Sequence, residues 1–260
     1  MPYTAVPSGQ LHYECRGTGS PLLMVSGLGG VASFWTPQRP RFEKRFTVIT
    51  YDHRGSGRST RSPPPYSMHG MSDDVLALLD HLQLDRVRFV GHSTGGAIGQ
   101  ILAARHADRI DRLVLSATWS HPDPYFHRLF TLRRDLVLQA GTDFYTRLST
   151  LMLYPPDWIA AHDHHLVEEH RALDKLQREI IASKLGALLE FDGRAALPNI
   201  GCPTLVVAAR DDATVPSYLS VMLSQGIRNA RLTMLGSGGH YVPISRAEAF
   251  GHAIEPFLLE

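Results

Sequence analysis

Cysteine is scarce in this sequence, and the cysteines present lack the spacing of a redox or zinc motif. Cys15 and Cys202 are the only two among 260 residues, and no C-x-x-C occurs. Cys15 falls in a predicted N-terminal strand and Cys202 directly precedes another. We therefore expect buried free thiols rather than a disulfide or a metal-binding pair.

No charge of one sign dominates, and no apolar run is long enough to cross a membrane. Lys and Arg number 26 against 25 Asp and Glu, for a net charge of +1, and the basic residues are scattered. This excludes the basic footprint expected of a protein that binds nucleic acid or an acidic membrane. Residues Met1 to Pro7 lack the basic and apolar regions of a signal peptide, so a cytoplasmic location is expected.

Strand patterns alternate with helical patterns from Pro21 to Ala117, as in a mostly parallel sheet with crossover helices on both faces. One helix is expected from Ser72 to Leu82, with Ser72 at its N-cap. Between residues 120 and 190 the patterns are helical, and strands resume at Pro203. We expect an α/β fold with one domain, 1–260, and an insertion at about 120–190.

A nucleophile elbow is predicted at Gly91-His92-Ser93-Thr94-Gly95. A short apolar strand runs into this G-x-S-x-G pattern, and the small-residue start of a helix follows. The sharp turn needs nearly side-chain-free neighbours, which Gly91 and Gly95 supply, and it lifts the Ser93 hydroxyl toward a ligand.

Partners for Ser93 follow two later strands. Asp211 and Asp212 come after the strand that begins at Pro203, and His240 comes after the strand that begins at Arg231. A serine hydroxyl needs an imidazole to accept its proton, and the imidazole needs a carboxylate to orient it. The chain order Ser, Asp, His differs from that of the chymotrypsin-like and subtilisin-like proteases.

Two N-terminal segments complete a resemblance to the α/β-hydrolase superfamily. The strand from Pro21 ends in Gly27-Leu28-Gly29-Gly30, similar to the oxyanion loop, and the strand from Phe46 ends in DHRGSGRS, similar to the D-x-R-G-x-G-x-S signature. The resemblance implies that the N–H groups of Leu28 and Thr94 bind the oxyanion. The usual loop begins His-Gly; here Ser26 replaces the histidine, so another group must brace the loop.

The resemblance also selects between the adjacent aspartates and implies a role for the insertion. The acid in these proteins stands four residues before a proline, which in Asp212-Ala213-Thr214-Val215-Pro216 is Asp212. Asp211 is then expected to be a turn carboxylate. The insertion at about 120–190 corresponds to a helical cap over the active site, so the implied architecture is the α/β-hydrolase fold.

Three further segments resemble one subgroup: SGLGG at 26–30, FWTPQ at 34–38 and LYPPDW at 153–158. They are similar to the RutD-type hydrolases assigned to aminoacrylate or carbamate, and next to the 3-oxoadipate enol-lactonases. This implies a serine hydrolase acting on a small ester, lactone, amide or carbamate through an acyl-enzyme, without a cofactor. A general carboxylesterase, a C–C hydrolase and a small-molecule receptor on the same fold are the alternatives.

Residues of the insertion and its approach are the candidates for contact with the substrate. A carboxylate can be bound by an arginine, and aromatic rings can form a pocket wall. The candidates are Arg128, Arg133, Arg134, Arg147, Trp119, Tyr154 and Trp158. The histidine-rich run at 162–170 lacks the H-E-x-x-H spacing, so no metal site is expected. The expected partner is a small-molecule substrate, and a homodimer is compatible with the sequence.

Overall fold

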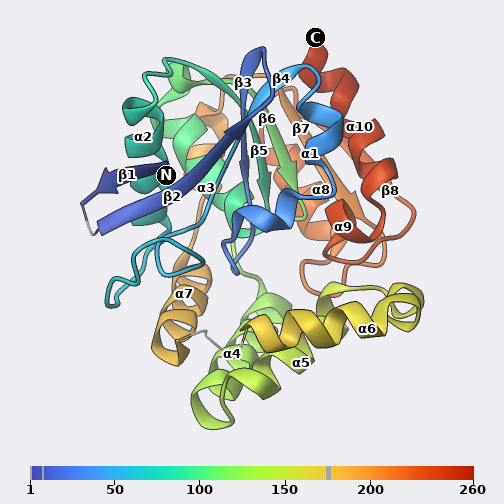
Figure 1. Ribbon diagram of the computed structural model, residues 1–260. Coiled ribbons are helices and arrows are strands. Elements are labelled where there is room, and N and C mark those ends of the chain that lie inside the picture. Colours follow the sequence, from blue (N-terminus) through green and yellow to red (C-terminus); the bar gives the residue numbers. More distant parts are fainter. Residues whose placement is uncertain (1, 8, 174–176) are drawn as a thin grey trace.

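The structure, a computed structural model, describes residues 2–7, 9–173 and 177–260, apart from the side chains of 165 and 167–173. Within this part of the chain, eight strands form one sheet in the order β1-β2-β4-β3-β5-β6-β7-β8 (Figure 1). β2 pairs antiparallel with β1 and β4, and the other neighbours are parallel. The strands are β1 (Tyr3–Val6), β2 (Gly9–Arg16), β3 (Ser20–Val25), β4 (Phe46–Tyr51), β5 (Val87–His92), β6 (Ile110–Ser116), β7 (Thr204–Ala209) and β8 (Arg231–Leu235). The predicted α/β fold with a mostly parallel sheet is confirmed.

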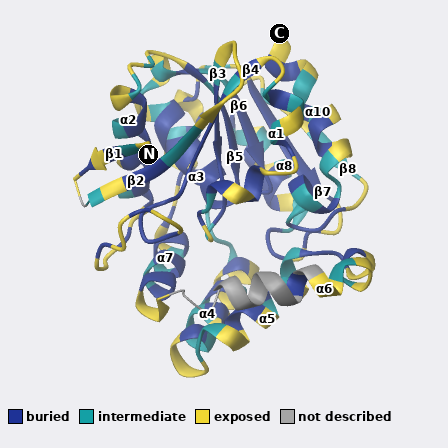
Figure 2. Cartoon of the chain, in the orientation of Figure 1, coloured by how far each residue is buried: buried dark blue, intermediate teal, exposed yellow. Residues whose placement is uncertain are grey.

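Helices cover both faces of the sheet. One face packs against α2 (Met68–His81), α3 (Thr94–Arg105) and α8 (Ser217–Gly226), and the other against α1 (Arg39–Phe42), α9 (Val242–Ser245) and α10 (Ala247–Leu259). Strand residues alternate between the two cores, so that Leu23 of β3 joins the first and Leu22 the second. Because both faces are covered, the central strands are buried along their length (Figure 2), as parallel sheets require.

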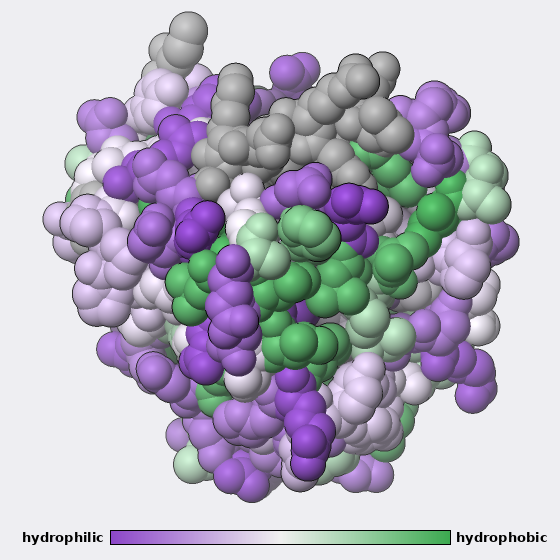
Figure 3. All heavy atoms as spheres, turned by 90° about the horizontal axis from the view of Figure 1, so that it is seen from below, coloured by the Kyte–Doolittle hydropathy of each residue, from purple (hydrophilic) through white to green (hydrophobic). Residues whose placement is uncertain are grey.

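In the part of the chain that the structure describes, four α-helices lie between β6 and β7 in the sequence and below the sheet in Figure 1. These cap helices are α4 (Pro124–Gln139), α5 (Thr142–Leu153), α6 (Pro156–Leu173) and α7 (Arg178–Glu190). Seen from below, this end of the molecule carries a group of apolar residues among hydrophilic ones (Figure 3). Its exposed apolar residues include Leu132, Phe144 and Leu151. No helix within the described ranges is long and apolar enough to cross a bilayer.

Two local expectations were wrong. Helix α2 begins at Met68 rather than Ser72, because the Ser67 hydroxyl accepts the N–H of Gly70 at 3.0 Å and the buried Met68 and Met71 extend the apolar face by a turn. Ser72 is buried inside the helix. Both cysteines are free, but Cys15 is exposed and Cys202 half-buried. Cys15 lies on β2 beyond the residues that pair with β1, so that end of the strand is open to solvent.

Candidate active site

Ser93 stands at the turn between β5 and α3 in a backbone conformation that few residues adopt. Its φ is 53° and its ψ is −116°, in the left-handed region. A Cβ at Gly91 would collide with the carbonyl of Gly95, and one at Gly95 would collide with the carbonyl of Val25 on β3. Glycine is therefore required on both sides of Ser93, as the elbow motif predicted.

His240 joins Ser93 to Asp212. Its Nε2 lies 2.9 Å from Oγ of Ser93, and its Nδ1 lies 2.8 Å from Oδ2 of Asp212. All three side chains are buried, with no more than 5% of Ser93, 4% of Asp212 and 2% of His240 exposed. They follow β5, β7 and β8, so the carboxyl ends of three strands bring together residues far apart in the sequence. The geometry permits proton transfer from the serine hydroxyl to the imidazole.

The two neighbouring aspartates have different partners. Oδ1 of Asp212 accepts the N–H groups of Thr214 and Val215, both at 2.8 Å, which turns Oδ2 toward His240. The Asp211 carboxylate instead accepts the N–H groups of Gly238 at 3.0 Å and Gly239 at 2.9 Å. Asp211 thus holds the turn that leads into His240, while Asp212 contacts the imidazole itself.

The loop at Gly27 and Leu28 lies against the nucleophile. A Cβ built on Gly27 would be 3.3 Å from Cβ of Ser93, and Leu28 lines the same cavity as Ser93. Thr94 is the first residue of α3, where an α-helix leaves N–H groups without an intrahelical acceptor and carries partial positive charge. The Leu28 and Thr94 amides are thus candidate donors to an oxyanion on the substrate.

Asp52 and His53 brace this loop where the usual histidine is replaced by Ser26. Oδ1 of Asp52 accepts the N–H of Ala32 at 2.8 Å, and Oδ2 accepts the N–H of Arg58 at 2.9 Å. The His53 amide donates to the Gly30 carbonyl at 2.7 Å. Asp52 opens the DHRGSGRS segment, but its role in holding the loop depends on contacts that the sequence does not show.

His92 packs behind the candidate triad as a neutral imidazole. It is fully buried, stacks on Phe34 with ring centroids 4.9 Å apart, and lies 5.0 Å from the His240 ring. Burial, and then the nearby His240, lower the pKa of His92 well below its usual range. A neutral neighbour leaves His240 free to take up a proton without repulsion from a second cation.

A cavity of about 590 Å³ opens onto Ser93 and His240. Residues between 27 and 37, residues of α4 and α5, the segment after α5 and Leu188 of α7 line this cavity. Most of the lining is apolar, as is typical of small-molecule sites. Besides Ser93 and His240, the polar side chains of the lining include Arg133, Tyr145, Thr146, Ser149 and Thr214.

Arg133 is a buried cation in the cavity wall. Only 4% of the residue is exposed, and Nη2 donates to the Tyr145 hydroxyl at 3.0 Å and to Oγ of Ser149 at 3.1 Å. The guanidinium lies over the rings of Phe130 and Tyr145, at 5.0 and 5.2 Å from their centroids. Among the described residues no carboxylate pairs with it, and Nε has no hydrogen-bond partner.

The other three arginine candidates lie outside the cavity wall. Arg128 is exposed, and Arg134 is partly exposed with its Nε 3.7 Å from Asp135. Arg147 is exposed and pairs with Asp143 at 3.7 Å. Helix geometry explains the difference, since Arg134 is one residue from Arg133 on α4, and Arg147 is two residues from Tyr145 and Ser149, on the opposite side of α5.

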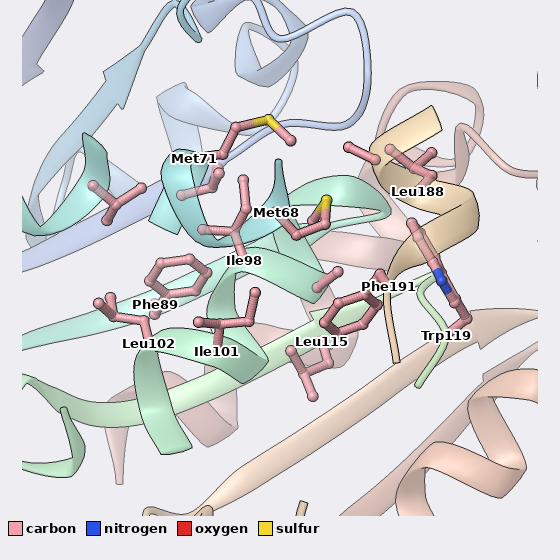
Figure 4. Close-up of a cluster of buried hydrophobic side chains, with 14 of the residues drawn as sticks. Met68, Met71, Phe89, Ile98, Ile101, Leu102, Leu115, Trp119, Leu188 and Phe191 are labelled. Carbon is pink, nitrogen blue, oxygen red and sulfur yellow. The ribbon is translucent and has the colours of Figure 1, made fainter. Parts of the chain in front are cut away.

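Of the aromatic candidates, only Tyr154 lines the cavity. Trp119 is fully buried in the core, with its ring 4.7 Å from that of Phe126 and 6.2 Å from that of Phe191 (Figure 4). The expectation that Trp119 forms a pocket wall is therefore corrected, because Phe126 and Phe130 of α4 and Phe191 at the end of α7 pack against the indole. Trp158 stacks behind Tyr154 at 4.3 Å and supports the wall from outside.

The histidine-rich run lies on α6. Nδ1 of His162 donates to the Trp158 carbonyl at 2.8 Å, and His164 is exposed. The side chains of His165, Glu168, Glu169 and His170 lie outside the described residues. Where side chains are described, no group of three metal-ligating residues occurs.

Comparison with known proteins shows which family this chain belongs to. Residues 20–247 match the family model described as alpha/beta hydrolase fold. The chain belongs to this family. As an α/β hydrolase it is an enzyme that catalyses hydrolysis, and the resemblance inferred from the sequence is confirmed.

Relatives of this α/β hydrolase match it along most of its length. A protein of Caulobacter sp. (strain K31) named "Putative carbamate hydrolase RutD" is 40% identical over 240 residues, which cover 91% of this chain and 90% of the relative. The crystal structure of the enol-lactonase from Burkholderia xenovorans LB400 has a TM-score of 0.93 at 31% identity and covers 100% of both chains. A thermophilic esterase from Thermogutta terrifontis, with malate bound, has a TM-score of 0.87 at 27% identity, covering 98% of this chain and 96% of the esterase.

Proposed function

We propose that this enzyme is a serine hydrolase of small acyl compounds, with Ser93 as nucleophile, His240 as general base and Asp212 as the acid that orients His240. The observation that carries the proposal is the hydrogen-bonded line from Ser93 through His240 to Asp212, which opens onto the cavity. The Leu28 and Thr94 amides are the proposed oxyanion donors. No cofactor is required for this chemistry.

The proposed reaction has two halves. Oγ of Ser93 attacks the substrate carbonyl carbon while Nε2 of His240 takes the hydroxyl proton, and the N–H groups of Leu28 and Thr94 stabilise the negative oxygen. Collapse expels the alcohol, enol or amine, which leaves with the proton from His240. Water then attacks the acyl-enzyme with the same groups in the same roles, and the acid product and free Ser93 are released.

We further propose that the substrate is an ester, lactone, amide or carbamate that bears a carboxylate or similar anionic group bound by Arg133. A buried cation without a carboxylate partner is costly, and an anion in the cavity offsets that cost. The cavity volume of about 590 Å³ suits a small acyl compound rather than a long lipid chain. The names of the carbamate hydrolase and enol-lactonase relatives and the malate bound to the esterase support this choice.

The nucleophile is tested with p-nitrophenyl acetate and a fluorophosphonate probe. The Ser93→Ala variant should fold normally, lose about three or more orders of magnitude in kcat, and resist labelling by the probe. Activity within about tenfold of wild type would rule out the serine mechanism.

The anion subsite is tested by the ratio of kcat/KM for a short carboxylate-bearing lactone or carbamate to that for a neutral ester of equal length. Arg133→Met should lower this ratio by about 100-fold, because the substrate carboxylate loses a buried charged partner. Arg134→Met is the matched control, because Arg134 is the next residue on α4 and its side chain lies outside the cavity wall. A ratio unchanged by Arg133→Met would favour a general carboxylesterase. Cleavage of only a C–C substrate, or tight binding without turnover, would favour the C–C hydrolase or the receptor.

A further inference from the structure

The carboxyl end of α5 contacts both loops that carry the candidate acid and base. The last four carbonyls of an α-helix have no intrahelical donor and need partners from elsewhere. The Met152 carbonyl accepts the Thr214 hydroxyl at 2.8 Å, and the Leu153 carbonyl accepts the Tyr241 amide at 2.8 Å. Thr214 is two residues after Asp212, and Tyr241 directly follows His240. One helix end therefore joins the two loops.

The loop before His240 lies directly against this helix end. A Cβ built on Gly239, whose φ is +62°, would be 3.0 Å from the Leu153 carbonyl oxygen and 3.1 Å from Pro155. Only glycine leaves room for this approach at such a φ. The position of α5 thus constrains where His240 can stand.

The acid loop is held by the cap helices from two sides. Thr214 is 1% exposed; its amide donates to Oδ1 of Asp212 and its hydroxyl donates to α5. On the α4 side, the Tyr125 hydroxyl donates to the Ala213 carbonyl at 2.5 Å. Two neighbours therefore link Asp212 to the cap helices. Ala213 accepts a hydrogen bond from Tyr125 of α4, and Thr214 donates both to α5 and to Asp212 itself.

The same helix lines the cavity. Tyr145, Thr146 and Ser149 of α5 stand in the cavity wall, about one to two turns before the Met152 and Leu153 carbonyls that contact the loops. A helix transmits displacement along its axis as a rigid element. Any movement of α5 on the substrate side therefore reaches the loops of Asp212 and His240.

We propose that the carboxyl end of α5 aligns the candidate triad, and that Thr214 is the positioning residue through which α5 sets the Asp212 carboxylate. The inference rests on the proposed serine mechanism. Asp212 stabilises the imidazolium of His240 only when Oδ2 faces Nδ1, and that orientation depends on the turn from Asp212 to Val215. Thr214 acts through Asp212 and not on the reacting atoms.

The hydroxyl of Thr214 is tested by steady-state kinetics of the full-length enzyme with p-nitrophenyl acetate. Thr214→Val keeps the shape but removes the hydroxyl, and kcat should fall about tenfold with KM changed less than about twofold. The acid limb of the kcat/KM pH profile should move to lower pH, because a poorly held carboxylate stabilises the imidazolium less. Thr214→Ser should restore both kcat and the pH profile.

Two further variants separate positioning from general destabilisation. Tyr125→Phe removes the hydrogen bond from α4 to the Ala213 carbonyl at a half-exposed side chain, and it should also lower kcat. Thr204→Val is the matched control, since Thr204 is 2% exposed and its hydroxyl bonds the Cys202 carbonyl at the far end of β7. Thermal melting of each variant shows whether a loss of kcat merely follows a loss of stability.

The proposal would be overturned if Thr214→Val had the kcat and the pH profile of the wild type. It would also be overturned if Thr214→Ser lost as much kcat as Thr214→Val. Failure of the serine mechanism itself has a different signature. In that case Ser93→Ala keeps its activity whatever the Thr214 variants do. If Ser93→Ala is inactive and unlabelled while Thr214→Val is unaffected, the mechanism stands and the positioning role falls.

Discussion

Lys184 makes the stability of this protein depend on pH in a direction that can be measured. It lies on α7, is 2% exposed, and donates from Nζ to Oγ of Ser56 at 2.7 Å. Nearby, Asp74 already pairs with Arg54 at 2.9 Å, so its charge offsets that of Lys184 only in part. Burial, and then the Arg54 charge, lower the pKa of Lys184 from 10.5 to about 7.

The lowered pKa corresponds to about 5 kcal/mol of preference for the neutral amine, at about 1.4 kcal/mol per pH unit over the fall from 10.5 to about 7. Below pH 7 Lys184 is protonated in both the native and the unfolded chain, so the native state is destabilised by the full cost of burying the charged amine. Between about pH 7 and 10.5 the unfolded chain binds a proton that the native chain has lost, so the free energy of unfolding rises with pH.

The substitution Lys184→Met removes the charge, keeps an apolar stem and leaves the Arg54–Asp74 pair intact. It forfeits the bond to Ser56, worth about 1 kcal/mol. The difference in unfolding free energy, variant minus wild type, should be positive at pH 6 and fall by about 3 kcal/mol by pH 9. Urea unfolding at both pH values measures it, with the exposed Lys44→Met as control. An equal difference at pH 6 and pH 9 would refute the assignment of a buried charge cost to Lys184.

Three further outcomes are expected. Asp212→Asn should lose far more kcat than Asp211→Asn, because Asp212 alone contacts His240; the reverse order in ester hydrolysis would exchange their roles. Asp52→Asn should lower kcat about tenfold with little change in KM, because an amide cannot accept both backbone N–H groups; an unchanged kcat would remove Asp52 as the brace of the oxyanion loop. Gly95→Ala should cost about 1–3 kcal/mol of stability, because its Cβ would meet the Val25 carbonyl, and a wild-type melting temperature would contradict this.

Local patterns were enough to predict the sheet and the elbow. Alternating strand and helix periodicity identifies a parallel sheet, since that architecture needs apolar strands separated by crossover helices. The tight turn at Ser93 leaves no room for a Cβ on Gly91 or Gly95, so the requirement is visible as G-x-S-x-G. The order Ser93, Asp212, His240 is likewise a property of the chain, and the carboxyl ends of parallel strands meet at one edge whatever lies between them.

Contacts between residues distant in sequence decided which side chains line the cavity, which are buried in the core and where α2 begins. Four arginines of the insertion have the same chemistry, and only the packing of α4 and α5 leaves Arg133 in the cavity. Trp119 became core because Phe191 at the end of α7 packs against it, and α2 gained a turn through burial of Met68. The contact of Thr214 with the end of α5 carries no sequence signal, because a buried threonine hydroxyl acquires its acceptor only when two separate segments fold together.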